Sequence, residues 1–300
     1  MTDLEMDIDV KYNEPMNLHT TFGIGGPADI FIQPRSVDEI VKCLRICSER
    51  GITFFILGNG SNLLVRDEGF RGMVIDMSTP HLKSISVKGD IIRSSSSVYL
   101  SELLKISTEH GLSGLEFLAG IPATLGGAIR TNASARDYMD PDTWYDMTSL
   151  VNAVKLIDAN GNIISLTSNE IGSSGGCLDL KGRVILEAEL ILRKADKEGV
   201  ERRMGCFYRR KQKTQESVRP NAGCIFKNPA KGKSSAGQLI DACGLKGTRI
   251  GAAAVSEKHA NFIINTGGAT SRDVLNLMDL IRRSVLEKFG VMLETEIEIV

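Results

Sequence analysis

Residues 54–62 constrain the fold of this chain most strongly, because an apolar run there ends abruptly in a glycine-rich turn. The run Phe54-Phe55-Ile56-Leu57 predicts a short buried strand. The turn is Gly58-Asn59-Gly60-Ser61-Asn62, and its two glycines allow the backbone to bend sharply and to approach a ligand. Successive backbone N–H groups in such a turn can bind an anion, and the Asn and Ser side chains add hydrogen-bonding groups. The segment therefore predicts either a tight turn between two strands or a site for a pyrophosphate.

Two common nucleotide-binding motifs are absent from this turn. No G-x-G-x-x-G sequence opens a helix here, and no P-loop lysine follows the glycines. A second segment rich in small residues lies at 120–133, with the sequence GIPATLGGAIRTNA. Small residues at this density allow a planar ring to lie against the backbone, although close packing of a helix on a strand has the same requirement.

The spacing of apolar residues predicts a chain of mixed helices and strands. Helices are expected at 36–50, with Ser36 as its N-cap and Gly51 at its end, and at 100–110, 198–210, 235–244 and 271–289. Strands are expected at 30–33, 54–57, 184–192 and 291–300, together with pairs at 87–98 and at 154–164. The second pair is a hairpin around Asn160-Gly161. Residues 1–16 are expected to be a loosely ordered arm, and residues 138–148 to be irregular.

Composition excludes several classes of protein. The net charge is −1 over 300 residues, which argues against a general nucleic-acid-binding surface. No apolar run approaches the roughly 20 residues of a membrane span, and the N-terminal sequence MTDLEMDIDV does not resemble a signal peptide. The six cysteines show no C-x-x-C pairing, so reduced thiols in a cytoplasmic protein are expected, and no metal site. The oligomeric state is left open.

Four segments, in this order along nearly the whole chain, resemble one enzyme family. They are residues 58–75 (GNGSNLLVRDEGFRGMVI), 120–133, 219–229 (RPNAGCIFKNP) and 255–263 (VSEKHANFI). The family is that of the UDP-N-acetylenolpyruvoylglucosamine reductases (MurB), which are FAD enzymes of peptidoglycan precursor synthesis. The resemblance implies an α+β fold of the vanillyl-alcohol-oxidase (PCMH) type. It comprises FAD-binding subdomains at 1–80 and 81–195 and a smaller C-terminal substrate-binding domain at 196–300.

The resemblance also implies the reaction and the residues that perform it. FAD would take hydride from NADPH and pass it to the enolpyruvyl group of a UDP-sugar, a reaction that serves the cell wall, cell shape and cell division. Cys224 stands where the family has a serine proton donor, and Glu294 where it has a catalytic glutamate. The implied substrate-binding residues are Lys213, Lys227 and Asn228. The implied FAD-binding residues are Gly58, Asn59, Gly60, Ser61, Asn62, Gly120, Ile121, Pro122, Gly126, Gly127, Asn132 and Ala133.

A cysteine can replace the family's serine as an acid. An ordinary thiol has a pKa of about 8.5 and gives up a proton far more readily than a serine hydroxyl. Lys227, three residues further on, could favour the thiolate that results. A lone cysteine is more often a small buried apolar residue, but its place in an Asn-Ala-Gly turn that matches the family favours the catalytic role.

Three departures from the family leave alternatives open. The family's N-A-G-A-Y-G sequence is NASARD here, at 132–137, and Glu216 replaces a proline. A Tyr-Arg motif whose arginine binds the substrate carboxylate is replaced by residues 171–177, IGSSGGC. Arg130 and Arg136 could substitute for that arginine by chain position only. The open alternatives are a non-catalytic or altered-specificity FAD-binding relative and a flavoprotein oxidase of the same fold group.

Overall fold

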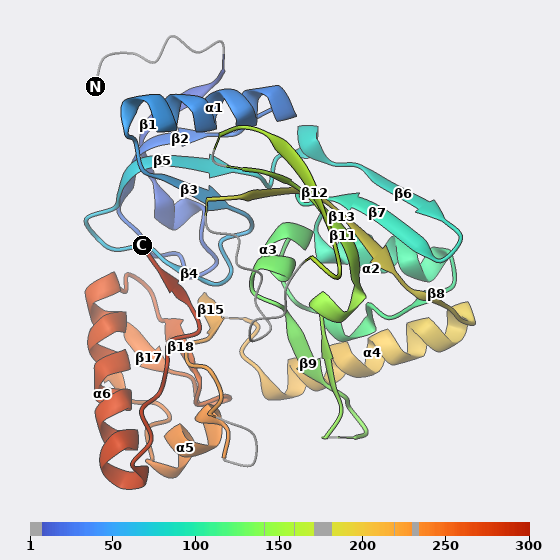
Figure 1. Ribbon diagram of the computed structural model, residues 1–300. Coiled ribbons are helices and arrows are strands. Elements are labelled where there is room, and N and C mark those ends of the chain that lie inside the picture. The colour runs from blue at the N-terminus through green and yellow to red at the C-terminus, as the bar shows by residue number, and fades with distance from the viewer. Residues whose placement is uncertain (1–7, 141, 159, 171–181, 219, 230–233) are drawn as a thin grey trace. The chain divides into compact units, whose positions relative to one another are not determined.

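The computed structural model describes residues 8–140, 142–158, 160–170, 182–218, 220–229 and 234–300 (Figure 1). Backbone contacts divide the chain into two units. The first unit comprises Met1–Lys11, Ile30–Asn59 and Gly72–Lys211, and the second comprises Tyr12–Asp29, Gly60–Arg71 and Gln212–Val300. In the part of the chain that the structure describes, no helix has the length and apolar character needed to span a membrane.

The N-terminal region forms a four-stranded sheet that is covered by one helix. The strand order is β1 (Val10–Pro15), β2 (Pro27–Ile32), β5 (Phe70–Asp76) and β3 (Phe54–Leu57), with β3 and β5 parallel. Helix α1 (Val37–Arg50) begins where the Ser36 hydroxyl accepts from the Glu39 N–H, and it ends at Gly51 in the left-handed conformation. Its apolar face packs on the sheet through Ile40, Cys43, Leu44 and Cys47.

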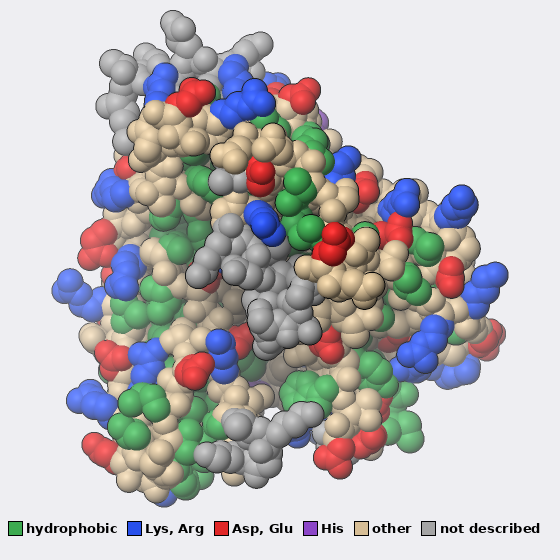
Figure 2. Space-filling view, in the orientation of Figure 1, with side chains coloured by type: hydrophobic (Ala, Val, Ile, Leu, Met, Phe, Trp, Pro, Cys, Tyr) green, Lys and Arg blue, Asp and Glu red, His purple; other side chains and the backbone are tan. Residues whose placement is uncertain are grey.

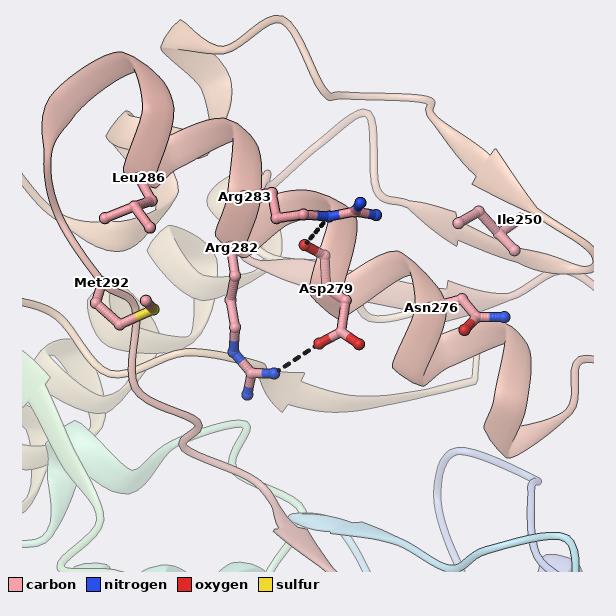
Figure 3. Close-up of a pocket in the computed structure, with 7 residues that line it drawn as sticks. All are labelled: Ile250, Asn276, Asp279, Arg282, Arg283, Leu286 and Met292. Carbon is pink, nitrogen blue, oxygen red and sulfur yellow. Dashed lines mark hydrogen bonds and ion pairs between the residues drawn. The ribbon is translucent and has the colours of Figure 1, made fainter.

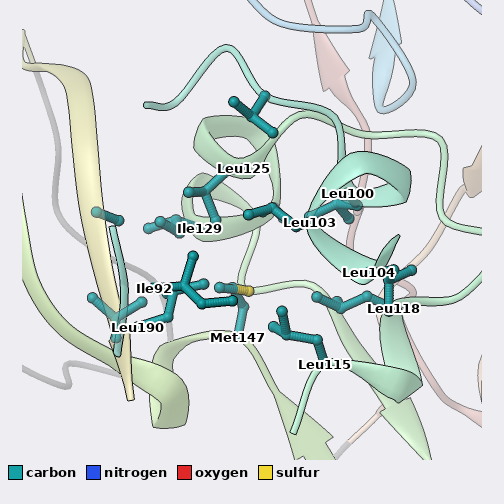
Figure 4. Close-up of a cluster of buried hydrophobic side chains, with 14 of the residues drawn as sticks. Ile92, Leu100, Leu103, Leu104, Leu115, Leu118, Leu125, Ile129, Met147 and Leu190 are labelled. Atoms are coloured by element: carbon teal, nitrogen blue, oxygen red, sulfur yellow. The ribbon is translucent and has the colours of Figure 1, made fainter. Parts of the chain in front are cut away.

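The first unit also contains a five-stranded sheet. Its order is β12 (Ile163–Thr167), β11 (Val151–Ile157), β13 (Val184–Ile191), β7 (Ile91–Ser95) and β6 (Ile85–Lys88), with antiparallel neighbours throughout. Helices α2 (Leu100–Glu109) and α3 (Leu125–Arg130) bury leucine and isoleucine side chains against Ile92 and Leu190 of this sheet (Figure 4). The remaining elements are α4 (Lys197–Thr214), β8 (Leu112–Ser113) paired with β14 (Arg193–Lys194), and β9 (Ser134–Arg136) paired with β10 (Trp144–Asp146).

The second unit is built around a four-stranded sheet and a long helix. The strand order is β15 (Asn221–Cys224), β18 (Phe262–Asn265), β17 (Ala253–Val255) and β16 (Arg249–Ile250). Helix α6 (Ser271–Phe289) packs Val274, Leu277, Met278 and Ile281 into this unit's core, which α5 (Ala236–Ala242) also joins. Strands β4 (Leu63–Leu64) and β19 (Glu298–Ile299) form a separate parallel pair.

Most elements that the sequence predicts are present. The helix expected at 271–289 has those bounds, and α1 starts one residue after its predicted cap. The helix expected from 198 extends from 197 to 214, whereas the helix expected at 235–244 is shorter, at 236–242. The hairpin at β11–β12 is confirmed, but its loop covers 158–162 because Ile157 pairs with Ile163.

Three local predictions are wrong. Residues 10–15 form a strand of the first sheet and not a loose arm. Residues 138–148 include β10, whose turn is closed by Asp137 and Asp140 carboxylates that accept backbone N–H groups. The final strand, expected over 291–300, is limited to 298–299 with one earlier bridge at Thr295, because this segment changes pairing partner along its length.

The predicted domain boundaries at 80 and 195 stay a prediction. Buried apolar residues form three clusters, two of which lie in the first unit and one in the second. Lys and Arg side chains are interspersed with Asp and Glu on the face shown in Figure 2, in keeping with a net charge of −1.

Candidate functional site

The two glycine-rich segments of the first unit contact each other directly. The Asn59 Nδ2 donates to the Pro122 carbonyl oxygen at 2.6 Å. A Cβ atom added at Gly58 would lie 2.8 Å from the Thr124 Oγ1, so only glycine allows this approach. The structure thus brings together two segments that are far apart in the sequence and that the family resemblance assigns to FAD.

Helix α3 presents small residues next to this contact. The Thr124 hydroxyl accepts from the Gly127 N–H at 3.3 Å, while the Gly126 N–H donates to the Ser96 carbonyl at 2.9 Å. A Cβ at Gly126 would lie 2.8 Å from the Ser96 Cβ, which explains that glycine by packing alone. At Gly127 a Cβ would lie 3.5 Å from the Thr124 Oγ1, which is an ordinary contact distance, so packing does not require glycine there. The two glycines leave this turn without side chains, as a flat cofactor held against the backbone would require.

The other predicted FAD-binding residues of the first unit have structural partners. The Asn132 Oδ1 accepts from the Thr148 N–H at 3.0 Å, and the Ala133 carbonyl accepts from the Met147 N–H at 3.0 Å. Ile121 is half-buried and packs against the apolar cluster that contains α2. A Cβ at Gly120 would lie 3.1 Å from the Tyr208 ring, so helix α4 supports this turn.

The remaining part of the first turn belongs to the second unit. Gly60 has a φ of 61° and lies against the backbone of His19, where a Cβ would be 2.2 Å from the carbonyl oxygen. The Asn62 Nδ2 donates to the Glu296 carbonyl at 3.3 Å. The Ser61 hydroxyl has no hydrogen bond to any residue that the structure describes, so it is available to a ligand.

Glu116, in the short 3-10 helix Glu116–Leu118, is a buried carboxylate just before the Gly120 turn. It accepts from the Ser113 hydroxyl at 2.6 Å and from the Gly114 N–H at 2.7 Å, and its Oε1 is 3.9 Å from the Arg203 Nη1. Sequence reasoning missed this residue, since a single glutamate between apolar residues gives no sign that it is buried.

Three arginine side chains of α4 have partners among the described residues. Arg203 faces Glu116, and the Arg210 Nη1 donates to the Asp137 carbonyl at 2.6 Å. The Arg209 Nη2 contacts the Cys206 Sγ at 3.4 Å. Lys213, the predicted substrate-binding residue, is exposed and has no partner among the described residues.

Cys224 lies at the end of β15, after a bulge. The register between β15 and β18 shifts between Asn221 and Cys224, where Gly223 has a φ of 78°. A bulge with a left-handed glycine redirects the side chain that follows it. Cys224 is half-buried and is not in a disulfide, so it keeps the thiol that proton donation needs.

The chain segment after Cys224 pairs with the segment that holds Glu294. The Lys227 N–H donates to the Glu294 carbonyl at 2.9 Å, and the Glu296 N–H donates to the Ile225 carbonyl at 2.8 Å. The Lys227 Nζ is 3.8 Å from the Glu294 Oε2, with the Glu294 side chain 78% exposed. The pairing therefore brings a thiol, an ammonium and two carboxylates onto adjacent segments.

Glu296 is the second residue that sequence reasoning missed. It is half-buried, and burial raises the pKa of its carboxyl group, while the positive charge of Lys227 acts in the opposite direction. Both glutamates lie between Leu293 and Ile297, so the sequence alone gives no basis for choosing the buried one.

Asn228 and Arg136, one of the two candidate arginine substitutes, each have a structural partner. The Asn228 Oδ1 accepts from the Ala236 N–H at 3.1 Å, which gives that oxygen a structural role. The Arg136 guanidinium lies 4.9 Å from the centre of the Trp144 ring. Residues 171–177, which replace the family's Tyr-Arg motif, lie outside the described residues.

No group of three His, Cys, Asp or Glu side chains in the described chain could hold a metal ion.

Two cavities also lie in the described part of the chain. One of about 720 Å³ is in the second unit along α6 (Figure 3), lined by Ile250, Asn276, Asp279, Arg282, Arg283, Leu286 and Met292. The other, of about 530 Å³, lies in the first unit between α2 and α4 and reaches Gly120.

Comparison with known proteins identifies the family of this chain. The FAD binding domain model matches residues 28–167, and the model of the UDP-N-acetylenolpyruvoylglucosamine reductase C-terminal domain matches residues 212–300. A UDP-N-acetylenolpyruvoylglucosamine reductase of Caldanaerobacter subterraneus subsp. tengcongensis is 42% identical over 290 residues, which cover 96% of this chain and 92% of that protein. The chain belongs to the UDP-N-acetylenolpyruvoylglucosamine reductase family.

Other members of this reductase family agree in sequence and in fold. A Clostridium perfringens (strain SM101 / Type A) reductase is 38% identical over 294 residues, or 97% of this chain and 93% of that protein. The crystal structure of the reductase (MurB) from Thermus caldophilus matches with a TM-score of 0.77 and 34% identity, covering 98% of this chain and 99% of that one. The predicted α+β FAD-binding fold with a C-terminal reductase domain is therefore confirmed, as is FAD as cofactor.

Proposed function

We propose that this protein reduces UDP-N-acetylglucosamine enolpyruvate to UDP-N-acetylmuramate, using NADPH and FAD. Relatives that carry the reductase name match over nearly their whole length, and the FAD-binding domain is present. The product is a precursor of peptidoglycan, so the activity would serve cell-wall synthesis, cell shape and cell division. The reaction would take place in the cytoplasm.

The observation that carries this proposal is the pairing of residues 225–227, which directly follow Cys224, with residues 294–296. It gathers one proton donor, one cation and two carboxylates in a single part of the second unit. A reductase of an enolpyruvyl double bond needs a cation and a proton donor, because the carbon next to the carboxylate gains negative charge and must then receive a proton.

FAD, when bound, supplies to the distal carbon of the double bond the hydride that it has taken from NADPH. The roles of the protein's own residues follow from their chemistry. The Lys227 ammonium stabilises the negative charge that develops on the substrate. The Cys224 thiol gives its proton to the carbon that bears the carboxylate, and the thiolate is then reprotonated from solvent.

We assign the role of the family's catalytic glutamate to Glu296 and not to Glu294. The sequence resemblance points to Glu294, but this side chain is 78% exposed and is screened by water. Glu296 is half-buried with a raised pKa, which is typical of a carboxyl group that takes part in acid–base chemistry. Lys213, Lys227 and Asn228 stay proposed contacts for the substrate, and the segments around Gly58 and Gly126 proposed contacts for FAD.

One anaerobic experiment tests the proposed function. The flavin of the purified protein is reduced with NADPH, UDP-N-acetylglucosamine enolpyruvate is added, and the visible flavin band is followed. We expect the oxidised spectrum to return with formation of one equivalent of UDP-N-acetylmuramate. A flavin that reduces but stays bleached would indicate altered substrate specificity. Rapid reoxidation when oxygen is admitted to a sample without substrate would indicate an oxidase. A protein that takes up no FAD on reconstitution would contradict the proposal.

A further inference from the structure

Arg282 of α6 contacts both chain segments that carry the proposed reacting groups. Its Nη2 donates to the Thr295 hydroxyl, and its guanidinium carbon lies 5.4 Å from the centre of the Phe226 ring. Its Nη1 is held by the Asp279 carboxylate at 3.0 Å, an ion pair that is visible in Figure 3. One planar guanidinium thus connects the helix to two separate segments.

Both segments contribute buried residues to one apolar cluster, but few backbone hydrogen bonds join them. Phe226 and Thr295 form an isolated antiparallel bridge, and the flanking hydrogen bonds are those from the Lys227 and Glu296 N–H groups. Beyond this bridge the C-terminal segment turns to β4, where Glu298 pairs with Leu63. A bridge without a continuing ladder has few hydrogen bonds to fix its register, so a side chain that grips both residues matters more than in a regular sheet.

We propose that Arg282 is a positioning residue that holds Phe226 and Thr295 together and thereby fixes Lys227 against Glu294 and Glu296. The catalytic consequence rests on the function proposed above, whereas the structural part stands on the contacts alone. Arg282 touches none of the reacting groups, so its effect on the reaction passes through the two segments.

The chemistry of arginine suits this role. A planar guanidinium can donate to a carboxylate on one edge and to a hydroxyl on another while its face lies on an aromatic ring. A lysine offers one point charge on a flexible stem, so Arg282→Lys can keep the charge near Asp279 but cannot reproduce all three contacts. A displacement of reacting groups on the order of 1 Å can slow a reaction about 100-fold.

Amide hydrogen exchange tests the structural part without substrate or FAD. The variants are Arg282→Met and Thr295→Val, and the control is Arg283→Met, which alters the neighbouring exposed arginine of the same helix. We expect the Lys227 and Glu296 amides to exchange at least tenfold faster in the first two variants and at the wild-type rate in the control. Unchanged exchange of both amides in Arg282→Met and Thr295→Val would overturn the proposal.

Stopped-flow measurement of the two half-reactions tests the catalytic part. In Arg282→Met we expect the rate of flavin reduction by NADPH to stay within twofold of wild type, and the rate of reoxidation by the enolpyruvyl substrate to fall at least tenfold. Arg282→Lys should recover part of this loss, and the double variant with Thr295→Val should be no slower than the slower single variant. Equal losses in both half-reactions, or in Arg283→Met, would contradict a positioning role. A wild-type flavin that the substrate fails to reoxidise would refute the proposed function, while amide exchange would still decide the structural role of Arg282.

Discussion

Asn261 binds both backbone polar groups of Phe226. Its Oδ1 accepts from the Phe226 N–H at 3.0 Å, and its Nδ2 donates to the Phe226 carbonyl at 2.8 Å. The Asn261 side chain is buried, so it replaces a neighbouring strand for the residue that lies between the Cys224 thiol and Lys227. The family-like sequence at 255–263 thus includes a residue that holds the segment carrying the proposed reacting groups.

We expect Asn261→Ala to lower the free energy of unfolding. The substitution leaves the N–H and carbonyl of Phe226 without their partner, at a cost of about 1–3 kcal/mol for each buried group. Urea unfolding, followed by circular dichroism, measures this change. Asn276→Ala is the control, since Asn276 is exposed on α6 and alanine favours a helix. Equal stability of Asn261→Ala and wild type would show that water satisfies both groups.

A second prediction concerns the buried carboxylate near the Gly120 turn. Glu116→Gln replaces one of two accepting oxygens with an NH₂ group, so either the Ser113 hydroxyl or the Gly114 N–H loses its acceptor. We expect the free energy of unfolding to fall by about 1–3 kcal/mol and FAD to dissociate more readily. Equilibrium dialysis of FAD measures the second effect. Glu109→Gln, on the exposed face of α2, should change neither quantity.

Local signals explain which parts of the fold the sequence could predict. Ser36 and Gly51 bound α1, and Thr270 and Gly290 bound α6, and each of these residues acts within one turn of its helix. The segment 291–300 lacks such a signal, because its pairing partners are Phe226 and Leu63, which are distant in the sequence. The hairpin of β9 and β10 was missed for a related reason, since Asp side chains and not apolar alternation define its turn.

The same distinction applies to the candidate site. The sequence could nominate the glycine-rich turns and Cys224 as site candidates, because their residue types and order resemble those of the family. The partner of each group could not, since burial separates Glu296 from Glu294 and arises only when residues 294–296 pair with residues 225–227. The packing of Gly58 against Thr124 is likewise a tertiary contact that no local pattern encodes.

The raised pKa of Glu296 predicts how stability depends on pH. Burial favours the protonated form in the folded state, so the folded pKa lies above the unfolded value of about 4.3. This group stabilises the fold most fully below the unfolded pKa, and the contribution is lost as pH rises through the folded pKa. We therefore expect Glu296→Gln to be more stable than wild type at pH 7, with an advantage that disappears near pH 4.

Urea unfolding at both pH values measures this difference. Glu294→Gln is the matched control, because its exposed side chain should leave stability nearly unchanged at either pH. In the half-reactions, we expect Glu296→Gln to slow reoxidation by substrate more than Glu294→Gln does. If Glu294→Gln slows reoxidation more than Glu296→Gln does, Glu294 is the catalytic glutamate.

The last prediction tests whether the Cys224 thiol itself donates the proton. Cys224→Ala removes the proposed proton donor and should leave flavin reduction by NADPH intact while slowing reoxidation by substrate at least about 100-fold, the usual range for loss of a general acid. Cys224→Ser restores a hydroxyl, which the family resemblance places at this position, and should retain turnover. Cys243→Ala is the control. That half-buried thiol lies at the end of α5 and donates to the Ser284 carbonyl of α6. Wild-type reoxidation in Cys224→Ala would remove the thiol from the reaction and leave a water molecule as the proton source.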